Sequence, residues 1–333
     1  MKSRAPDRSR KVVPIAEAAE RRRGKVAREK LHDIADAVEG LDGDPDAPAH
    51  FTMLGNMALL EDAFEEAIDA FSRALSLAPE ELSALGGRGR ALAAMDEHAL
   101  ALADYDRAAA LAPDQARYHL GRANALGILG RMAEAVAAAT RAIEAEPHSA
   151  GAHYTRAVYR SHLDDDDDQG VRADLDRTVE LAPDEPLYRE KRADYLFDME
   201  EYDLAIVDLD RAIALGPGKA QLHYLRAKCL HESRSARRDG VRVWLTDQEA
   251  HQRCDAAVAS LERALELAPT EGELRGDILW ELVCVRETIG EPKAHLEAID
   301  TALAVLPEDD WPMLLPIREA VQRRLDDAGG EPA

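Results

Sequence analysis

A phrase of seven residues recurs seven times along this chain, and every copy ends in a proline. The first copy reads RALSLAP and the sixth reads RALELAP. The closing prolines follow one another at spacings of 34, 34, 36, 34, 52 and 38 residues, and they are Pro79, Pro113, Pro147, Pro183, Pro217, Pro269 and Pro307. A period of this length predicts stacked repeats, because one unit cannot bury its apolar face alone.

Each copy also places small and large side chains at fixed positions, numbered here so that the proline is position 32. In the first copy the pattern consists of Phe51 at position 4, Leu54 at 7, Gly55 at 8, Ala67 at 20, Phe71 at 24 and Ala74 at 27. Position 8 is glycine or alanine in the first six copies. The unit resembles the tetratricopeptide repeat, a helix–turn–helix of 34 residues. The resemblance implies that these small residues let the first helix of a unit (helix A) approach the second (helix B).

This resemblance predicts an all-α fold, a right-handed superhelical solenoid of about seven repeats between capping helices. The expected repeats are 48–81, 82–115, 116–149, 150–185, 186–219, 220–269 with an insertion at 232–250, and 270–307. The expected flanks are a basic disordered arm at 1–13, a capping helix and linker at 14–47, and a capping helix and tail at 308–333. The seventh copy is the most degenerate, and its first helix is expected at about 273–289.

The charge is unevenly distributed along the chain. The formal net charge is −23, yet residues 1–30 hold eleven basic and four acidic side chains. Such an arm could contact nucleic acid or a membrane surface. The acidic remainder repels polyanions and lacks interleaved aromatic residues, so an arm that contacts an acidic protein surface is favoured, in cis or in trans. No apolar run approaches the ~18 residues of a membrane span, and no secretory signal is evident. We expect a cytoplasmic protein.

A second charge pattern repeats with the units. Position 7 is arginine in five consecutive copies, namely Arg88, Arg122, Arg156, Arg192 and Arg226. Positions 23 and 25 are paired aspartates in three copies, namely Asp104/Asp106, Asp174/Asp176 and Asp208/Asp210. We interpret this as a structural ladder in which an arginine binds a carboxylate of its own repeat or of the preceding one. The spacing leaves both pairings open. The functional alternative is a row of anion-binding guanidinium groups.

Catalysis finds little support in the sequence. The motifs of zinc proteases, serine hydrolases and phosphate-binding loops are missing, so no enzyme activity, cofactor, metal or small-molecule substrate is expected. Three histidines recur at position 4 and are interpreted as packing residues: His119, His153 and His223. The run Asp164–Asp168 is interpreted as a solvated loop. Three cysteines are expected to be buried thiols, with a redox pair of the first two left open: Cys229, Cys254 and Cys284.

In tetratricopeptide-repeat proteins, function usually lies on the concave face, which helix A lines. The early copies carry glycines there that we expect to open a trough for a peptide backbone: Gly86, Gly87, Gly121 and Gly127. The candidate contacts on this face are Asn56, Arg90, Arg117, Asn124, Tyr154, Lys191, Tyr224 and Lys228. The family's carboxylate clamp for chaperone tails is not matched, because Thr52 and Gly87 occupy two of its positions.

The insertion reads SRSARRDGVRVWLTDQEA over residues 233–250. Its arginines and its tryptophan have the composition of an interaction hot spot, and the candidate contacts are Arg234, Arg237, Arg238, Arg242 and Trp244. The alternative is a loop whose Trp244 packs on its own long helix. Thr246 and Glu249 form a capping-box pattern, which predicts a helix from near Asp247 to about Leu267.

These observations favour a non-enzymatic scaffold or adaptor that binds a peptide or a partner protein on the concave face and the 233–245 loop. One alternative is the regulatory subunit of an enzyme carried by a separate chain. Another is a nucleic-acid or membrane-surface adaptor that acts through the basic arm. A homo-oligomer is left open, and the partner is not named by the sequence.

Overall fold

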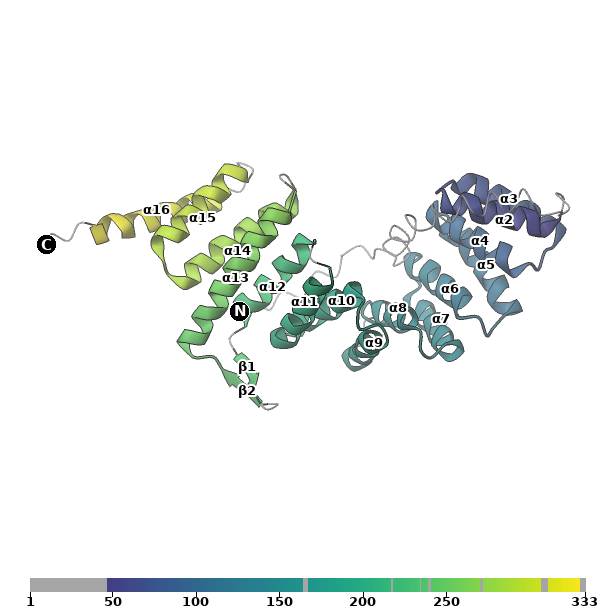
Figure 1. Cartoon of the computed structure of the whole chain (residues 1–333), viewed down its shortest axis with the longest axis horizontal. Coiled ribbons are helices and arrows are strands. Elements are labelled where there is room, and N and C mark those ends of the chain that lie inside the picture. The colour runs from purple at the N-terminus through teal and green to yellow at the C-terminus, as the bar shows by residue number, and fades with distance from the viewer. Residues whose placement is uncertain are drawn as a thin grey trace. The chain divides into compact units, whose positions relative to one another are not determined.

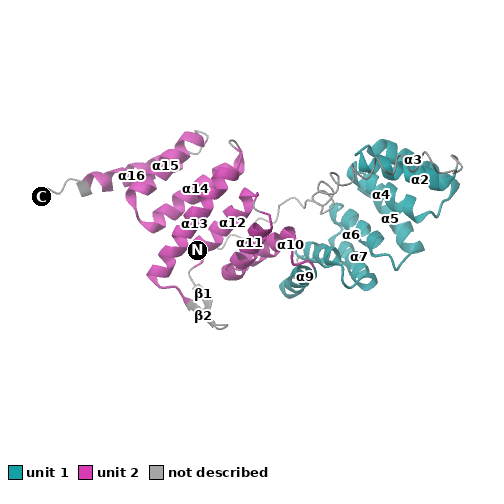
Figure 2. Cartoon of the chain, viewed as in Figure 1, with its two compact units in different colours: residues 1–181 teal, residues 182–333 magenta. Residues whose placement is uncertain are grey.

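The computed structural model describes residues 47–329, apart from 164–166, 217, 234, 239–240, 270–271 and 307–310. The arm and capping helix expected at 1–13 and 14–47 therefore lie outside the described residues, apart from Ala47. The chain divides into two compact units, residues 1–181 (unit 1) and 182–333 (unit 2) (Figure 2).

Unit 1 is a stack of four helix pairs, in which each helix packs against the next (Figure 1). Its helices are α2 (Pro48–Leu60), α3 (Phe64–Leu77), α4 (Leu82–Ala94), α5 (His98–Leu111), α6 (Ala116–Ile128), α7 (Met132–Ala145), α8 (Ala150–Arg160) and α9 (Asp168–Leu181). The even-numbered helices are the A helices, and neighbouring A helices also touch. Unit 1 thus presents one face made of A helices and one made of B helices.

Unit 2 has the same helix-pair packing in a less regular form. Its helices are α10 (Pro186–Asp198), α11 (Tyr202–Leu215), α12 (Ala220–Glu232), α13 (Asp247–Leu267), α14 (Glu273–Ile289), α15 (Pro292–Val305) and α16 (Trp311–Gly329). The predicted bounds of α13 and of α14 are confirmed, and so is the capping box of Thr246 and Glu249.

The turns between helix A and helix B have a shared geometry. Position 15 has a positive φ in four repeats, at Asp62, Asp96, Gly130 and Glu200. Glycine adopts this left-handed conformation freely, and aspartate tolerates it better than most residues. The turn reverses the chain within three or four residues, so helix B lies antiparallel against helix A. At the other end of each repeat the proline prevents helix B from continuing.

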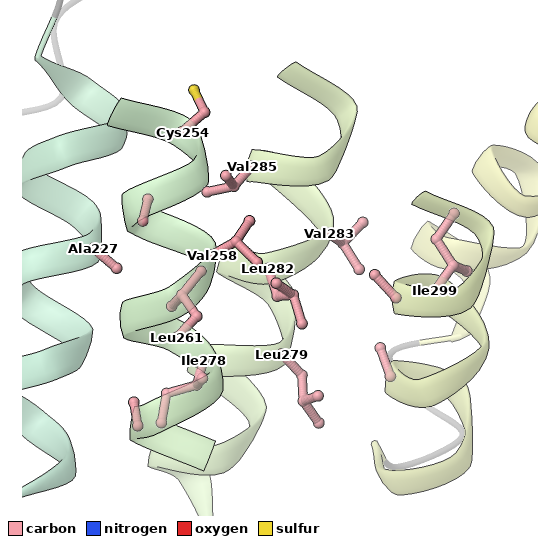
Figure 3. Packing of buried hydrophobic residues seen from close by; sticks show 14 of the residues in the cluster. Ala227, Cys254, Val258, Leu261, Ile278, Leu279, Leu282, Val283, Val285 and Ile299 are labelled. Atoms are coloured by element: carbon pink, nitrogen blue, oxygen red, sulfur yellow. The ribbon is translucent and has the colours of Figure 1, made fainter. Parts of the chain in front are cut away.

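The apolar core is distributed along the stack. In unit 1, small clusters join each repeat to the next, such as the one around Phe71, Leu85 and Tyr118. In unit 2, a larger cluster runs from α12 to α16 and includes Leu261, Ile278 and Ile299 (Figure 3). Each repeat is therefore stabilised by its neighbours, as expected for a solenoid.

The insertion departs from the all-α expectation. Residues expected to form a loop instead form an antiparallel hairpin of β1 (Ser235–Arg238) and β2 (Val241–Trp244), with Ser235 opposite Trp244. The two valines and the tryptophan of β2 favour a strand because β-branched and aromatic side chains suit a pleated backbone. The remaining described elements are helical.

Candidate functional site

The arginine ladder uses both of the pairings that the sequence left open. Arg88 donates to Asp104 of its own repeat from Nε and Nη2, both at 2.8 Å, and Arg156 and Arg192 bind Asp174 and Asp208 in the same way. Arg122 and Arg226 instead donate from Nε to the preceding repeat, to Asp106 and Asp210, each at 2.6 Å.

One rule accounts for the choice. An arginine binds position 23 of its own repeat where that position is aspartate. In the third and sixth repeats position 23 is Ala138 and Ser260, so the arginine turns to the aspartate at position 25 of the preceding repeat. Arg226 also donates to Ser260, at 2.7 Å. The ladder thus joins helices within and between repeats, which supports its interpretation as structural.

Two buried aspartates collect several donors each. Asp174 accepts from Arg156 and Arg160, and its Oδ1 lies 3.2 Å from Nδ1 of His153. Asp208 accepts from Arg189 and Arg192. Burying a carboxylate is tolerated when charged donors satisfy it, as they do here. These two carboxylates thus link the helices around them.

Position 4 has a second role that the sequence did not reveal. Nε2 of His119 lies 2.9 Å from the carbonyl oxygen of Pro113, and Arg189 donates to that of Pro183 at 2.9 Å. His153 makes the equivalent contact at 3.3 Å. These side chains satisfy the carbonyl of the proline that closes the preceding repeat. The interpretation of His119 and His153 as packing residues fits this arrangement.

The prediction that the glycines open a trough is wrong. Phe71 lies against Gly55 and Gly87, so closely that an added methyl group would overlap its ring. The other rings do the same, with Tyr105 against Gly89 and Gly121, Tyr118 against Gly86, and Tyr159 against Gly127. The missing side chains make room for the protein's own aromatic rings. A peptide backbone therefore has no channel at these positions.

The polar candidates of unit 1 lie on the A helices, and each contacts a nearby side chain. Arg90 is exposed and its Nη2 lies 3.5 Å from Oδ1 of Asn56. Asn124 accepts from the hydroxyl of Tyr159 at 3.1 Å; burial raises the pKa of Tyr159 to about 12, so it stays a donor. Arg117 is exposed and stacks on the ring of Tyr118 at 4.7 Å.

Tyr154 must be removed from the candidate contacts. Its side chain is only 6% exposed, because it points into the packing of unit 1 rather than toward a partner. In unit 2, Lys191 is committed to Asp194 at 3.0 Å. Lys228 lies 4.7 Å from the ring centre of Phe197 and 5.7 Å from that of Tyr224.

The hairpin carries Trp244, whose side chain is 80% exposed. The alternative in which it packs on its own long helix is therefore wrong. Both ends of the hairpin are fixed: Arg253 on α13 donates to Ser233 and to Asp203 on α11, and Thr246 caps α13. The side chains of the remaining candidates lie outside the described part of the chain, namely Arg234, Arg237, Arg238 and Arg242.

A group of polar side chains that no sequence pattern predicts joins α12 to α14. Nδ1 of His231 lies 2.7 Å from Oε1 of Glu281, and Nε2 lies 3.0 Å from Oγ1 of Thr288. Burial, reinforced by Glu281, raises the pKa of the nearby Cys284 to about 11. A thiol with so high a pKa is a poor nucleophile at neutral pH. The hydrogen bonds of His231 therefore link α12 to α14.

Neither a metal centre nor a membrane span is found in the described ranges. No group of three or more histidine, cysteine or acidic side chains there could hold a metal ion. None of the helices described is long and apolar enough to cross a membrane. Cys229 and Cys254 are free thiols that belong to different apolar clusters.

Stacked helix pairs that are joined by an ionic ladder define a helical-repeat protein. The tetratricopeptide-repeat family model matches residues 17–81, 87–150 and 190–236, more than half of the sequence. The chain therefore belongs to the tetratricopeptide-repeat family, whose members are typically non-enzymatic scaffolds for contacts between proteins. No curated protein matches the chain.

Solved structures show the same fold at low sequence identity. The C-terminal part of a TPR repeat-containing protein from Cytophaga hutchinsonii is 12% identical, with a TM-score of 0.60 over 77% of this chain and 96% of that one. PilF of Pseudomonas aeruginosa is 17% identical, with a TM-score of 0.54 over 67% and 93%. A chain of the APC/C hetero-tetramer Cut9–Hcn1 is 18% identical, with a TM-score of 0.58 over 76% and 46%. This chain thus spans less than half of that last relative.

Proposed function

We propose that this protein is a non-enzymatic scaffold that binds partner proteins, with Trp244 and its hairpin as the principal contact. The observation that carries the proposal is the exposure of Trp244, which exceeds that of every other large apolar side chain in the described residues. An exposed tryptophan gains a large apolar contact when a partner covers it. The hairpin is an addition to the 34-residue unit, so packing of the repeat does not require it.

The attachment of the hairpin supports the same proposal. Ser233 before it and Thr246 after it are both held by α13, and Arg253 extends the link to Asp203. A contact element that is fixed before binding loses less conformational entropy when a partner arrives. A mobile loop of the same composition would bind less tightly.

The test compares the full chain with a variant that lacks residues 235–244, closed by a short Gly/Ser linker. Ser233 and Thr246 are kept because each holds a described hydrogen bond. Partners captured by the wild type and identified by mass spectrometry should bind the deletion variant about 2 kcal/mol more weakly, at an unchanged melting temperature. Trp244→Ser should account for most of that loss. Full binding by a folded deletion variant would contradict the proposal.

The A-helix face of unit 1 is a second candidate surface. Arg90 and Arg117 are exposed there, and neither contacts a carboxylate within the described part of the chain. Replacing Asn56, Arg90 and Asn124 together by alanine should weaken partner binding while leaving the melting temperature within a few degrees. Tyr159→Phe is the matched control, since it removes the hydrogen bond to Asn124 without changing the surface.

The two other functions make different predictions. A regulatory subunit would co-purify with one enzyme in fixed stoichiometry. A nucleic-acid adaptor would bind polyanions through residues 1–30, with an affinity that falls steeply as salt rises. No observation in the described residues favours the regulatory subunit or the nucleic-acid adaptor over the scaffold.

A further inference from the structure

One lysine on the A helices of unit 2 is held in an unusual way. The ammonium group of Lys228 on α12 lies over the ring of Phe197 on α10 and near that of Tyr224 on its own helix. A cation is attracted to the electron-rich face of an aromatic ring. The two half-buried rings therefore fix a side chain that is ordinarily flexible, and they do so without neutralising its charge.

The other basic side chains of α10 and α12 have acidic partners. Arg189 and Arg192 bind Asp208, Arg226 binds Asp210, and Lys191 binds Asp194. Lys228 makes no hydrogen bond or ion pair with any described residue. In a protein with a net charge of −23, where acidic side chains outnumber basic ones, a cation left without such a partner is available to an external anion.

We propose that Lys228, held by Phe197 and Tyr224, is a carboxylate-binding subsite that takes an acidic side chain of a partner peptide. This rests on the proposed function, that the chain binds protein partners, and it adds the chemistry of the partner. The ammonium supplies a charge-assisted hydrogen bond, and the rings offer apolar contact to a neighbouring residue of the peptide.

The surroundings favour a carboxylate over a phosphate. Asp277 on α14 interacts electrostatically with Lys228 and with Glu273 of its own helix. Burial raises the pKa of Asp277, and Lys228 opposes that rise. A group with two negative charges would be repelled by these acidic side chains more strongly than a group with one. Asp277→Asn removes part of that repulsion and should strengthen binding of an acidic peptide.

The experiment selects peptides of about 12 residues from a phage-displayed random library on the full chain. Lys228→Met keeps the apolar stem over the rings and removes the charge, and Lys293→Met is the control on an exposed lysine of α15. Peptides enriched on the wild type should carry an acidic residue beside an apolar one. They should bind Lys228→Met about tenfold more weakly and Lys293→Met equally well.

Changing the acidic residue of a selected peptide to its amide should lower affinity for the wild type by the same factor and leave affinity for Lys228→Met unchanged. Should Lys228→Met fail to fold, Lys228→Gln replaces it. Equal binding of acidic peptides by the wild type and a folded variant would overturn the subsite alone. If no peptide were enriched on the wild type, binding of linear peptides would be overturned, and this subsite with it, while the test of Trp244 would still stand.

Discussion

The first two repeats of unit 1 and the first two of unit 2 solve the same packing problem with different side chains. In unit 1 the aromatic rings of Phe71 and Tyr105 at position 24 lie against glycines at position 8 and at position 6 of the next repeat. In the fifth and sixth repeats, which belong to unit 2, position 24 is leucine and position 8 is alanine, and the four side chains are fully buried: Leu209, Leu261, Ala193 and Ala227. The repeat thus specifies the volume shared by two helices, and a larger residue on one is matched by a smaller residue on the other.

The largest expected effect concerns the ladder rungs of unit 2. Asp208→Ala should lower the free energy of unfolding by about 3–5 kcal/mol, because two arginines lose their partner beside a buried site. Asp210→Ala on the same helix should lower it by no more than about 1 kcal/mol, because Asp210 is half exposed. Urea unfolding measures both.

The corresponding rung of unit 1 sharpens the comparison. Asp104 is buried but accepts from one arginine, where Asp208 accepts from two. Asp104→Ala should therefore cost less stability than Asp208→Ala. Equal effects would show that the number of donors does not matter.

A smaller effect is expected from adding one methyl group to unit 1. Alanine in place of glycine ordinarily stabilises a helix by about 1 kcal/mol. Gly87→Ala should instead destabilise by about 1–3 kcal/mol, because the added group overlaps the buried ring of Phe71. Gly276→Ala in unit 2 is the control, since its methyl group meets only the end of Leu306, at 3.0 Å.

A double variant tests the shared-volume idea directly. Combining Gly87→Ala with Phe71→Leu replaces the ring by a smaller side chain where the methyl group is added. The double variant should be more stable than the sum of the two single effects predicts, as a thermodynamic cycle of urea unfolding would show. Simple additivity would mean that the two positions are independent.

A pH effect is expected from His295 in unit 2. Burial lowers the pKa of His295 on α15, and Arg324 adds to this while Glu287 opposes it. In the unfolded chain the imidazole has a pKa of about 6.5, so it binds a proton more readily there than in the folded protein. The stability that neutral His295 contributes is therefore complete above that pH and is lost as pH falls. The melting temperature of the wild type should fall more than that of His295→Leu between pH 7.5 and 5.5. A pH-independent difference would contradict this.

The smallest expected effect concerns the rate at which the cysteines react. All three cysteines lie in unit 2, and burial raises the pKa of Cys229 to about 12 and that of Cys284 to about 11. Since the thiolate is the reactive form, iodoacetamide at pH 7.5 should label both more slowly in the native chain than in urea. Mass spectrometry of the labelled peptides gives the rates. Native labelling as fast as in urea would refute this.

Much of the fold could be predicted because its signals are local. A proline ends each helix B wherever it stands, and a threonine and a glutamate three residues apart fix the start of α13. The ladder could be predicted in its residue types but not in its pairings. An arginine reaches two helices, and only the identity of position 23 in its own repeat decides between them.

The candidate site was harder to predict because its surface depends on side chains from other helices. A glycine in the sequence is equally consistent with an open trough and with a space that an aromatic ring occupies. The ring that lies against Gly127 belongs to Tyr159, in the next repeat. Tyr154 could not be recognised as buried for the same reason. The hairpin did have a signal: Asp239-Gly240 between β-favouring residues is typical of a two-residue hairpin turn.

The choice of partner by each arginine also determines which repeats can be removed without leaving an arginine of the ladder unpaired. Arg122 has Ala138 in its own repeat and depends on Asp106 of the second. If the second repeat were excised, Arg122 would face Ser72 and have no carboxylate. If the third were excised, Arg156 would keep Asp174. The repeats are therefore not interchangeable, and their order along the chain is itself under physical constraint.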